Sequence, residues 1–114
     1  MKVIKKPWGD FKEFILNKKC TVKIITVKPG QELSLQKHTR RKEMWYFLTP
    51  GKVIVGNKNK KMKKGETIII EKKVPHRLIA RWKKVIVLEI AVGHFDENDI
   101  VRLEDKYGRI KDQR

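Results

Sequence analysis

Cysteine is almost absent from this chain of 114 residues, because Cys20 is the only one. One thiol cannot form an internal disulfide and cannot by itself build a thiolate metal cluster. Long apolar runs are missing too. The longest, residues 85–92, is interrupted by Glu89 and is far shorter than the ~20 residues that a membrane-spanning helix needs. We therefore expect neither a disulfide scaffold nor a transmembrane helix.

Targeting and linker segments are also missing. The first ten residues carry positive charge, but no apolar stretch and no small-residue cleavage site follow them, so we expect no secretory signal. There is no internal repeat and no low-complexity linker, and a chain of 114 residues closes around a single core. The sequence therefore predicts one cytoplasmic domain over residues 1–114, with residues 110–114 as a frayed tail.

Acidic residues are scarce: 13 Asp and Glu stand against 29 Lys and Arg, which gives a formal net charge of +16. A field of this sign attracts polyanions and phosphorylated small molecules. Most of the excess is lysine, which is equally typical of a solubilising surface. The lysines are densest at residues 56–61, which we expect to form a hairpin tip, and they are not interleaved with aromatic residues. We therefore do not expect a nucleic-acid-binding module.

The sequence does contain a series of short β-branched or aromatic runs separated by proline and glycine turns. These runs predict strands at residues 20–27, 43–48, 52–55, 67–70, 76–80 and 85–92. No window has a helical period before residues 96–105, where a short helix or turn is expected. The pattern is typical of an all-β sandwich or barrel, and closure into a barrel would remove the exposed edges of many short strands.

Potential metal ligands gather in residues 30–43. Gln36 and His38 are two residues apart, so on a strand both side chains leave the same face. Glu43 follows a basic run that can turn the chain, and His76 comes much later, directly after a proline. An isolated histidine is more often an ordinary hydrogen bonder. If the four converge, they supply an amide oxygen, two imidazole nitrogens and a carboxylate, which suits Zn, Mn, Fe, Co or Ni.

Longer stretches around these residues resemble a known family. They run in the family's order from residue 6 to residue 109: Lys6-Pro-Trp-Gly9, Val27-Lys-Pro-Gly30, Leu33-Ser-Leu-Gln-Lys-His38, Arg41-Lys-Glu43 with Trp45, His76-Arg77, Asp99-Ile-Val-Arg102 and Glu104-Asp-Lys-Tyr-Gly-Arg109. The family is the cupin domain of type II mannose-6-phosphate isomerases, which forms the C-terminal half of bifunctional mannose-1-phosphate guanylyltransferase/isomerase enzymes. The nucleotidyltransferase half of those enzymes has no counterpart here, so we expect no guanylyl transfer.

The resemblance implies a fold, an activity and a cofactor. The fold would be the cupin double-stranded β-helix, a jelly-roll barrel, assembled as a homodimer. The activity would be interconversion of mannose 6-phosphate and fructose 6-phosphate through an enediol or enediolate. A divalent metal would act as Lewis acid on Gln36, His38, Glu43 and His76. Zinc is expected first, with Mn, Co, Ni, Fe or Mg as alternatives.

Isomerisation also needs a base and cations that hold the phosphate. Glu89 is the candidate base, because burial in an apolar strand raises the pKa of a carboxyl; it could equally be a core carboxylate paired with an arginine. The family-like stretches offer four arginines for phosphate or sugar contacts: Arg41, Arg77, Arg102 and Arg109. Arg41 and Arg102 are also catalytic candidates. Strand alternation would turn Arg77 away from the ligand face.

Three departures from the family pattern affect the expected pocket. Met44 replaces a histidine, Ile79-Ala80 stands where the family usually has an asparagine, and Ala91 replaces a glutamine. Each removes a polar group from a family-like position. They favour an alternative function, a non-catalytic or differently catalytic cupin that binds a phosphorylated sugar or another small anion.

Overall fold

The computed structural model describes residues 1–109 as β-strands joined by turns and loops, so the predicted tail at residues 110–114 lies outside the described residues. The described part contains no helix long and apolar enough to cross a membrane. The strands are β1 (Lys2–Lys6), β2 (Gly9–Glu13), β3 (Cys20–Val27), β4 (Leu35–Lys37), β5 (Arg41–Phe47), β6 (Gly51–Val55), β7 (Lys58–Met62), β8 (Thr67–Ile70), β9 (His76–Ile79), β10 (Val85–Gly93) and β11 (Val101–Glu104).

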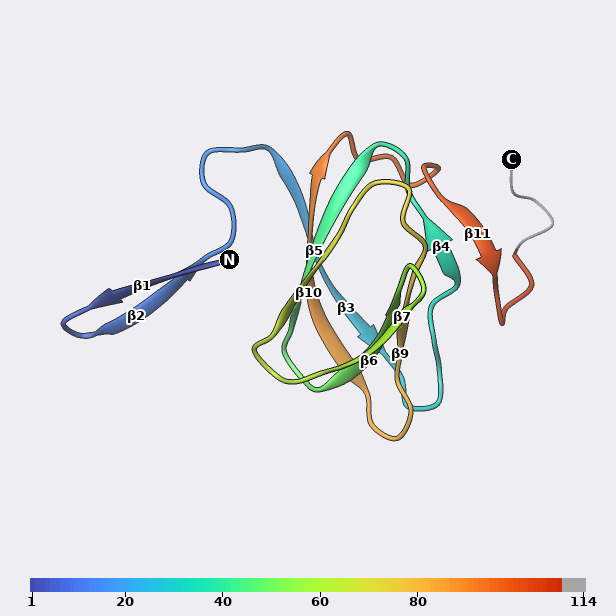
Figure 1. The fold of residues 1–114 in the computed structure, drawn as a ribbon, viewed down its shortest axis with the longest axis horizontal. Helices are drawn as coiled ribbons and strands as arrows, with labels where there is room; N and C mark the ends of the chain where they lie inside the picture. Colours follow the sequence, from blue (N-terminus) through green and yellow to red (C-terminus); the bar gives the residue numbers. More distant parts are fainter. Residues whose placement is uncertain (110–114) are drawn as a thin grey trace.

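Two antiparallel sheets build the barrel (Figure 1). One is four-stranded with the order β3-β10-β5-β8, and the other is five-stranded with the order β11-β4-β9-β6-β7. Strands β1 and β2 form a separate hairpin that projects from the barrel. The buried apolar residues come from both sheets and form one core: Val27, Trp45, Phe47, Val53, Met62, Ile70, Leu78, Ala80, Val85 and Val87. The fold is thus all-β, as predicted.

Alternation along the strands places charged residues inside this barrel. The buried positions of β5 are Arg41, Glu43, Trp45 and Phe47, and the residues between them face away from the core. On the neighbouring strand β10, Glu89 pairs with Trp45 and is buried as well. Charged groups are stable in such surroundings only when they are paired or hydrogen-bonded. The barrel interior therefore contains a polar region at one end of the apolar core.

Glycine allows two segments to meet at this polar end. Gly93, the last residue of β10, has φ of 116°, which favours glycine. A Cβ atom at this position would lie 2.6 Å from the carbonyl oxygen of Arg40. The loop that carries His38 and leads into β5 can therefore pack directly against the end of β10.

In residues 96–105, where a short helix or turn was expected, the structure has a turn followed by strand β11. The amide of Asp99 bonds the Asp96 carbonyl at 2.9 Å, and the amide of Asn98 bonds the Asp96 carboxylate at 2.9 Å. These bonds form a turn, after which Val101 and Arg102 pair with β4. Part of the segment with the helical period therefore forms a strand, because it pairs with a strand that is distant in the sequence. Of the two expected alternatives, a short helix or a turn, the structure has the turn.

Candidate metal centre

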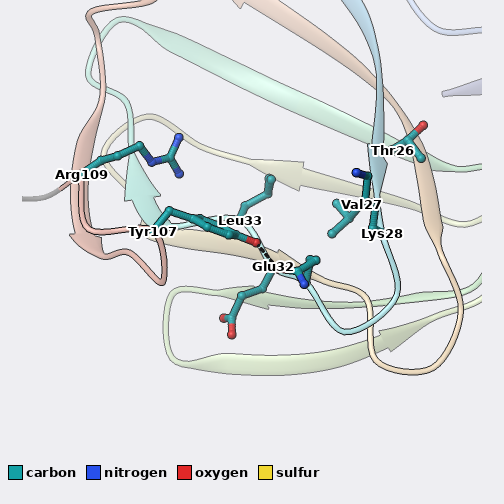
Figure 2. Close-up of a pocket in the computed structure, with 8 residues that line it drawn as sticks. Thr26, Val27, Lys28, Glu32, Leu33, Tyr107 and Arg109 are labelled. Atoms are coloured by element: carbon teal, nitrogen blue, oxygen red, sulfur yellow. Dashed lines mark hydrogen bonds between the residues drawn. The ribbon is translucent and has the colours of Figure 1, made fainter.

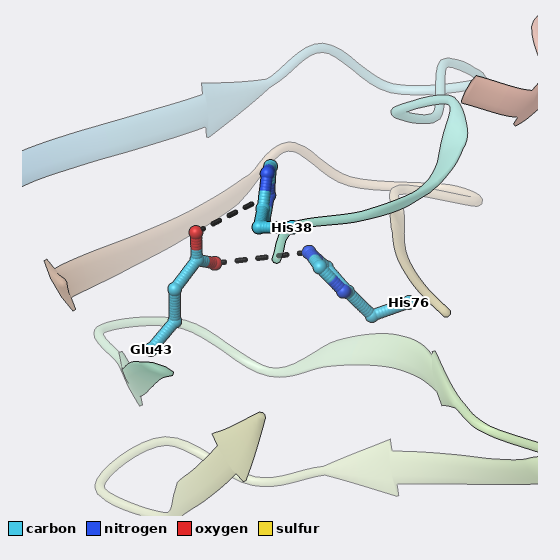
Figure 3. Close-up of side chains that lie close together, drawn as sticks. All are labelled: His38, Glu43 and His76. Carbon is cyan, nitrogen blue, oxygen red and sulfur yellow. Dashed lines mark ion pairs between the residues drawn. The ribbon is translucent and has the colours of Figure 1, made fainter. Parts of the chain in front are cut away.

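Three of the predicted ligands converge inside the barrel (Figure 3). His38 follows β4, Glu43 lies on β5 and His76 begins β9, and one ligand atom from each lies within 4.8 Å of the others. His38 Nε2 is 3.3 Å from Glu43 Oε2, and His76 Nε2 is 3.7 Å from Glu43 Oε1. The side chains are 4%, 1% and 1% exposed. The chain thus brings together residues far apart in sequence.

Backbone carbonyls orient both imidazoles toward Glu43. His38 Nδ1 lies 2.6 Å from the carbonyl oxygen of Asp99, and His76 Nδ1 lies 2.9 Å from that of Val74. A carbonyl oxygen only accepts, so each Nδ1 donates its proton and each Nε2 keeps a lone pair. Burial lowers the pKa of His38 and of His76. Both rings are therefore neutral at neutral pH, which is the form that binds a metal.

Glu43 provides the negative charge of the cluster. Burial acts to raise the pKa of Glu43, but a hydrogen bond with Glu89 and the neighbouring His76 and Arg41 outweigh it, and the pKa is lowered. The Trp45 indole N–H donates to Glu43 Oε1 at 3.1 Å, and Arg41 Nε donates to Oε2 at 2.8 Å. Both carboxylate oxygens are thereby fixed in orientation.

The cluster fits a divalent metal ion. His76 Nε2 is fully buried and has no hydrogen-bond partner within residues 1–109, which is rare for a buried polar atom. It faces the ionised Glu43, and the neutral His38 adds a second nitrogen donor. Two neutral imidazoles and one carboxylate are a donor set typical of zinc and other transition-metal ions with open positions. A metal ion would satisfy the buried His76 nitrogen.

Gln36 lies on the same face as the cluster. It pairs with His76 across β4 and β9, and paired residues on adjacent strands point to the same side of a sheet. The Ser34 hydroxyl donates to the side-chain carbonyl of Gln36 at 3.3 Å. The Gln36 side chain therefore shares a sheet face with His76, and its role as a fourth ligand stays a prediction.

Arg41 lies within the cluster itself. Its Nη2 is 3.2 Å from His38 Nε2, and its Nε bonds Glu43, so the guanidinium contacts the ligand atoms of both residues. Arg41 Nη1 also donates to the Asp96 carbonyl at 3.3 Å, and the guanidinium stacks on Phe95 at 4.4 Å. The sequence predicted a substrate-binding or catalytic arginine here, and the structure places a buried cation directly beside two candidate metal ligands.

Glu89 is a buried acid next to Glu43. Burial and the charge of Glu43 raise the pKa of Glu89 to about 8, so it is mostly protonated at neutral pH. The Trp45 indole N–H lies 3.4 Å from Glu89 Oε1. The upward shift that the sequence predicted is thus present. The two neighbouring carboxyl groups therefore differ in charge: Glu43 is ionised and Glu89 is neutral.

The pairing of β11 with β4 places a second arginine, Arg102, in register with the cluster residues. Arg102 on β11 pairs with Gln36 on β4, which in turn pairs with His76 on β9. The three side chains therefore form a row on one face of the five-stranded sheet. Arg102 is half-buried in this row.

The other two candidate arginines lie elsewhere. Arg77 faces out of the barrel, where its guanidinium pairs with Glu32 and Glu104, both at 3.0 Å. Arg109 pairs with Asp105 at 2.7 Å and lines a pocket of about 390 Å³ with Tyr107 (Figure 2). That pocket contains none of the candidate metal ligands. The structure thus does not bring Arg77 or Arg109 to the cluster.

The three departures from the family pattern occupy different environments. Ala91 pairs with Glu43 and is buried beside it, so a polar side chain is missing next to the cluster. Ala80 is buried at the end of β9 and belongs to the apolar core. Met44 points to the opposite side of β5 from Glu43, near Ile69 and Ile90. Strand alternation thus turns Met44 away from the face of β5 that carries Glu43.

Sequence reasoning missed the groups that orient the ligands. The carbonyls of Asp99 and Val74 fix the imidazoles, and the Asp99 carboxylate bonds the amides of Thr39 and Arg40 at 2.9 Å. Backbone carbonyls carry no side-chain signal in a sequence. Asp99 thus holds the turn after His38.

Comparison with solved structures defines the class of protein. A conserved protein from Klebsiella pneumoniae with a double-stranded β-helix domain matches with a TM-score of 0.61 and 17% identity, over 69% of this chain and 71% of that chain. A cupin protein from Bacteroides fragilis matches with a TM-score of 0.59 and 14% identity, over 73% and 83%. The barrel described above is therefore a cupin fold.

Sequence comparison then gives the family. The family model for the mannose-6-phosphate isomerase C-terminal domain matches residues 1–105, so the chain belongs to this family. Mannose-1-phosphate guanylyltransferase ManC of Salmonella typhimurium is 34% identical over 92% of this chain, and the xanthan biosynthesis protein XanB of Xanthomonas campestris is 36% identical over 91%. The matches cover 22% and 23% of those two proteins, so this chain spans less than a quarter of their length.

Proposed function

We propose that this domain is a metal-dependent sugar-phosphate isomerase that interconverts mannose 6-phosphate and fructose 6-phosphate. The observation that carries the proposal is the buried cluster of His38, Glu43 and His76, found in a domain of the mannose-6-phosphate isomerase C-terminal family. A fold of this kind hosts many activities, so the cluster and the family together support the reaction, and the barrel alone does not.

His38, Glu43 and His76 would hold the metal, with Gln36 as the fourth ligand. When bound, a divalent ion, with zinc expected first, supplies Lewis-acid polarisation of the sugar's carbonyl and hydroxyl oxygens. The carbonyls of Asp99 and Val74 keep both imidazoles in the required tautomer. The apolar core around the cluster excludes bulk water, which strengthens every electrostatic interaction there.

Glu89 is assigned to the proton transfer. Aldose–ketose isomerisation moves a proton between C2 and C1, so one group must take the proton and return it. The pKa of Glu89 is raised to about 8, which suits a group that both holds and releases a proton near neutral pH. Its carboxyl lies beside Glu43 and Trp45 of β5, on the inner face of the same sheet.

Arg41 and Arg102 are assigned to the phosphate and the sugar oxygens. Guanidinium groups bind phosphate through two parallel hydrogen bonds, which lysine cannot match. Arg102 stands in the row of Gln36 and His76, and Arg41 contacts the cluster directly. Arg77 and Arg109 are tied to carboxylates away from the cluster and have no part in this assignment.

The decisive experiment is a coupled assay of mannose 6-phosphate conversion on chelator-stripped protein, with Zn, Mn, Co, Ni, Fe or Mg added back singly. We expect turnover to return with at least one metal. His38→Ala and His76→Ala should lose metal and activity together, whereas His94→Ala, at an exposed histidine, should change neither. Full metal occupancy in both cluster variants would refute the ligand assignment.

A second candidate function follows from Ala91. Its methyl group lies beside Glu43 where a polar side chain could contact a substrate. A cupin that binds a phosphorylated sugar or another small anion without isomerising it is the function that this gap favours. Metal binding without turnover on any added metal would support this candidate and contradict the isomerase.

A further inference from the structure

Trp82 is exposed on the surface in the turn between β9 and β10. Its side chain is 85% exposed, more than any other large hydrophobic side chain within residues 1–109. Arg81 and Lys83 flank it directly, and both are exposed as well. A single exposed tryptophan is common and would need no explanation by itself. Its surroundings are what distinguish it.

Two hollows lie against Trp82, of about 380 Å³ and about 410 Å³. Both are lined by Lys52, Ile79, Arg81 and Trp82, so they adjoin and form one groove along the indole. Lys52 pairs with Ile79 of β9 and with Lys61 of β7. Because the alternate residues of these strands are buried in the core, this row lies on the outer face of the five-stranded sheet. The groove is thus separate from the cluster inside the barrel.

The groove is strongly basic. Four cationic side chains line it: Lys52, Lys61, Arg81 and Lys83. None of the four forms an ion pair within the part of the chain that the structure describes. Glu32 is the one acidic residue that lines either hollow, and it already pairs with Arg77 at 3.0 Å. The groove therefore combines an exposed aromatic face with uncompensated positive charge.

We propose that this groove binds single-stranded nucleic acid, with a base stacked on Trp82 and backbone phosphates paired with the four cations. An aromatic platform inside a positively charged groove is the arrangement by which proteins hold single strands without reading their sequence. A second copy of the chain would place like charges against each other, which disfavours it as the occupant. The fold creates this arrangement by bringing the turn around Trp82 next to Lys52 and Lys61, which are far from it in sequence.

Fluorescence anisotropy with a labelled oligothymidylate about 15 nucleotides long tests the proposal. With four phosphate contacts, log affinity should fall with log salt at a slope of about −2.8, so that raising salt from about 50 to about 200 mM weakens binding about 50-fold. Binding that does not occur even at the lower salt concentration would overturn the proposal.

Variants separate stacking from charge. Trp82→Ala should weaken binding about tenfold and leave the salt slope unchanged, and Trp82→Phe should restore most of the affinity. Lys52→Gln should reduce the slope by about 0.7. The matched controls are Trp8→Ala, at an exposed tryptophan on the projecting hairpin, and Lys2→Gln, an exposed lysine of β1. Neither control should change affinity or slope.

Three results would overturn the assignment. Unchanged affinity of Trp82→Ala would mean that no base stacks there. Equal affinity for a duplex of the same length would exclude stacking, because paired bases cannot reach the indole. Equal affinity for thymidine monophosphate would assign the groove to a free nucleotide. Since Trp82 and Lys52 lie on the outside of the barrel, the isomerase assay remains an independent measure of folding and of the proposed catalytic function.

Discussion

At the scale of single residues, Arg41 competes for the atoms that a metal ion would bind. Its guanidinium donates to Glu43 Oε2 and lies 3.2 Å from His38 Nε2, and both atoms belong to candidate metal ligands. The cation and a metal ion repel each other at this distance, and they use the same lone pairs. Metal binding must therefore displace the Arg41 guanidinium from at least one of these contacts.

Replacement of Arg41 should tighten metal binding. Arg41→Leu removes the competing cation and introduces no ligand atom, so we expect the affinity for zinc to rise at least about tenfold. Competition against a chromophoric chelator measures this affinity. Arg77→Leu, which removes an arginine from the outer face, is the matched control and should leave it unchanged. Weaker zinc binding by Arg41→Leu would mean that Arg41 organises the ligands and does not compete with the metal.

Glu89 makes the stability of the metal-free protein depend on pH. Its folded-state pKa is raised to about 8 from 4.5, so the folded state holds a proton that the unfolded state releases. This contribution to stability is complete below about pH 4.5 and is lost as the pH rises toward 8. Glu89→Gln cannot ionise, so it should gain stability relative to the wild type over this interval. Urea unfolding at several pH values measures the difference, and parallel curves for the two proteins would contradict the shifted pKa.

At the scale of secondary structure, the turn after β4 and the segment before β11 stabilise each other. The Asp99 carboxylate accepts from the amide and hydroxyl of Thr39 and from the amide of Arg40, while the Asp99 carbonyl accepts from His38. Partial burial opposes ionisation of Asp99, but the bonds from Thr39 and Arg40 outweigh it and lower its pKa to about 2. One residue thus holds the turn that delivers a metal ligand.

Loss of the Asp99 carboxylate should loosen this turn. Asp99→Ala should lower the free energy of unfolding by about 1 kcal/mol at neutral pH, since three hydrogen bonds at a partly exposed site are lost. Because the pKa of Asp99 is depressed, its contribution is present above about pH 4 and fades as the pH falls through 2. The difference between wild type and variant in urea unfolding should therefore shrink in acid. A difference that stays constant down to pH 2 would contradict this role.

The strands differ in how well their sequences predict them. The bounds of β3 and β8 match the prediction, and β10 differs by one residue, because their β-branched and apolar runs are a local signal. Strands β4, β7 and β11 are short or polar and exist through pairing with distant strands, so no local pattern indicates them. For the same reason the sequence predicts only a short helix or turn in the segment that contains β11.

The candidate metal site, like the strands, was predictable only where the sequence carries a local signal. The spacing of side chains and the family resemblance were enough to predict His38, Glu43 and His76 as a cluster. The buried position of Arg41 between two ligands depends on the alternation of β5 and on Phe95 from a distant loop. Such three-dimensional contacts have no sequence signal. The turn with Trp82 likewise meets the lysines of β6 and β7 only after folding.

At the scale of the whole molecule, apolar side chains on the β1–β2 hairpin and on the outer face of β3 are exposed. The hairpin of β1 and β2 projects from the barrel (Figure 1). Trp8 and Phe11 in this hairpin are exposed. On the outer face of β3, Val22 and Ile24 are 55% and 65% exposed. A two-stranded hairpin alone is at best marginally stable in water, so packing against another surface would stabilise it. We propose that the hairpin of one copy packs on the outer face of β3 in a second copy, which gives a homodimer.

This arrangement predicts a mass in solution of twice the chain mass of 13.5 kDa, measured by light scattering after size exclusion. Val22→Lys combined with Ile24→Lys should convert the dimer to a monomer, because charges placed on this face disfavour its burial. Both positions are exposed in the single chain, so the barrel should still fold. Leu103→Lys, at an exposed position on β11, should leave the dimer intact. A wild-type protein that runs as a monomer, or a dimer that survives the double substitution, would rule out this face as the interface.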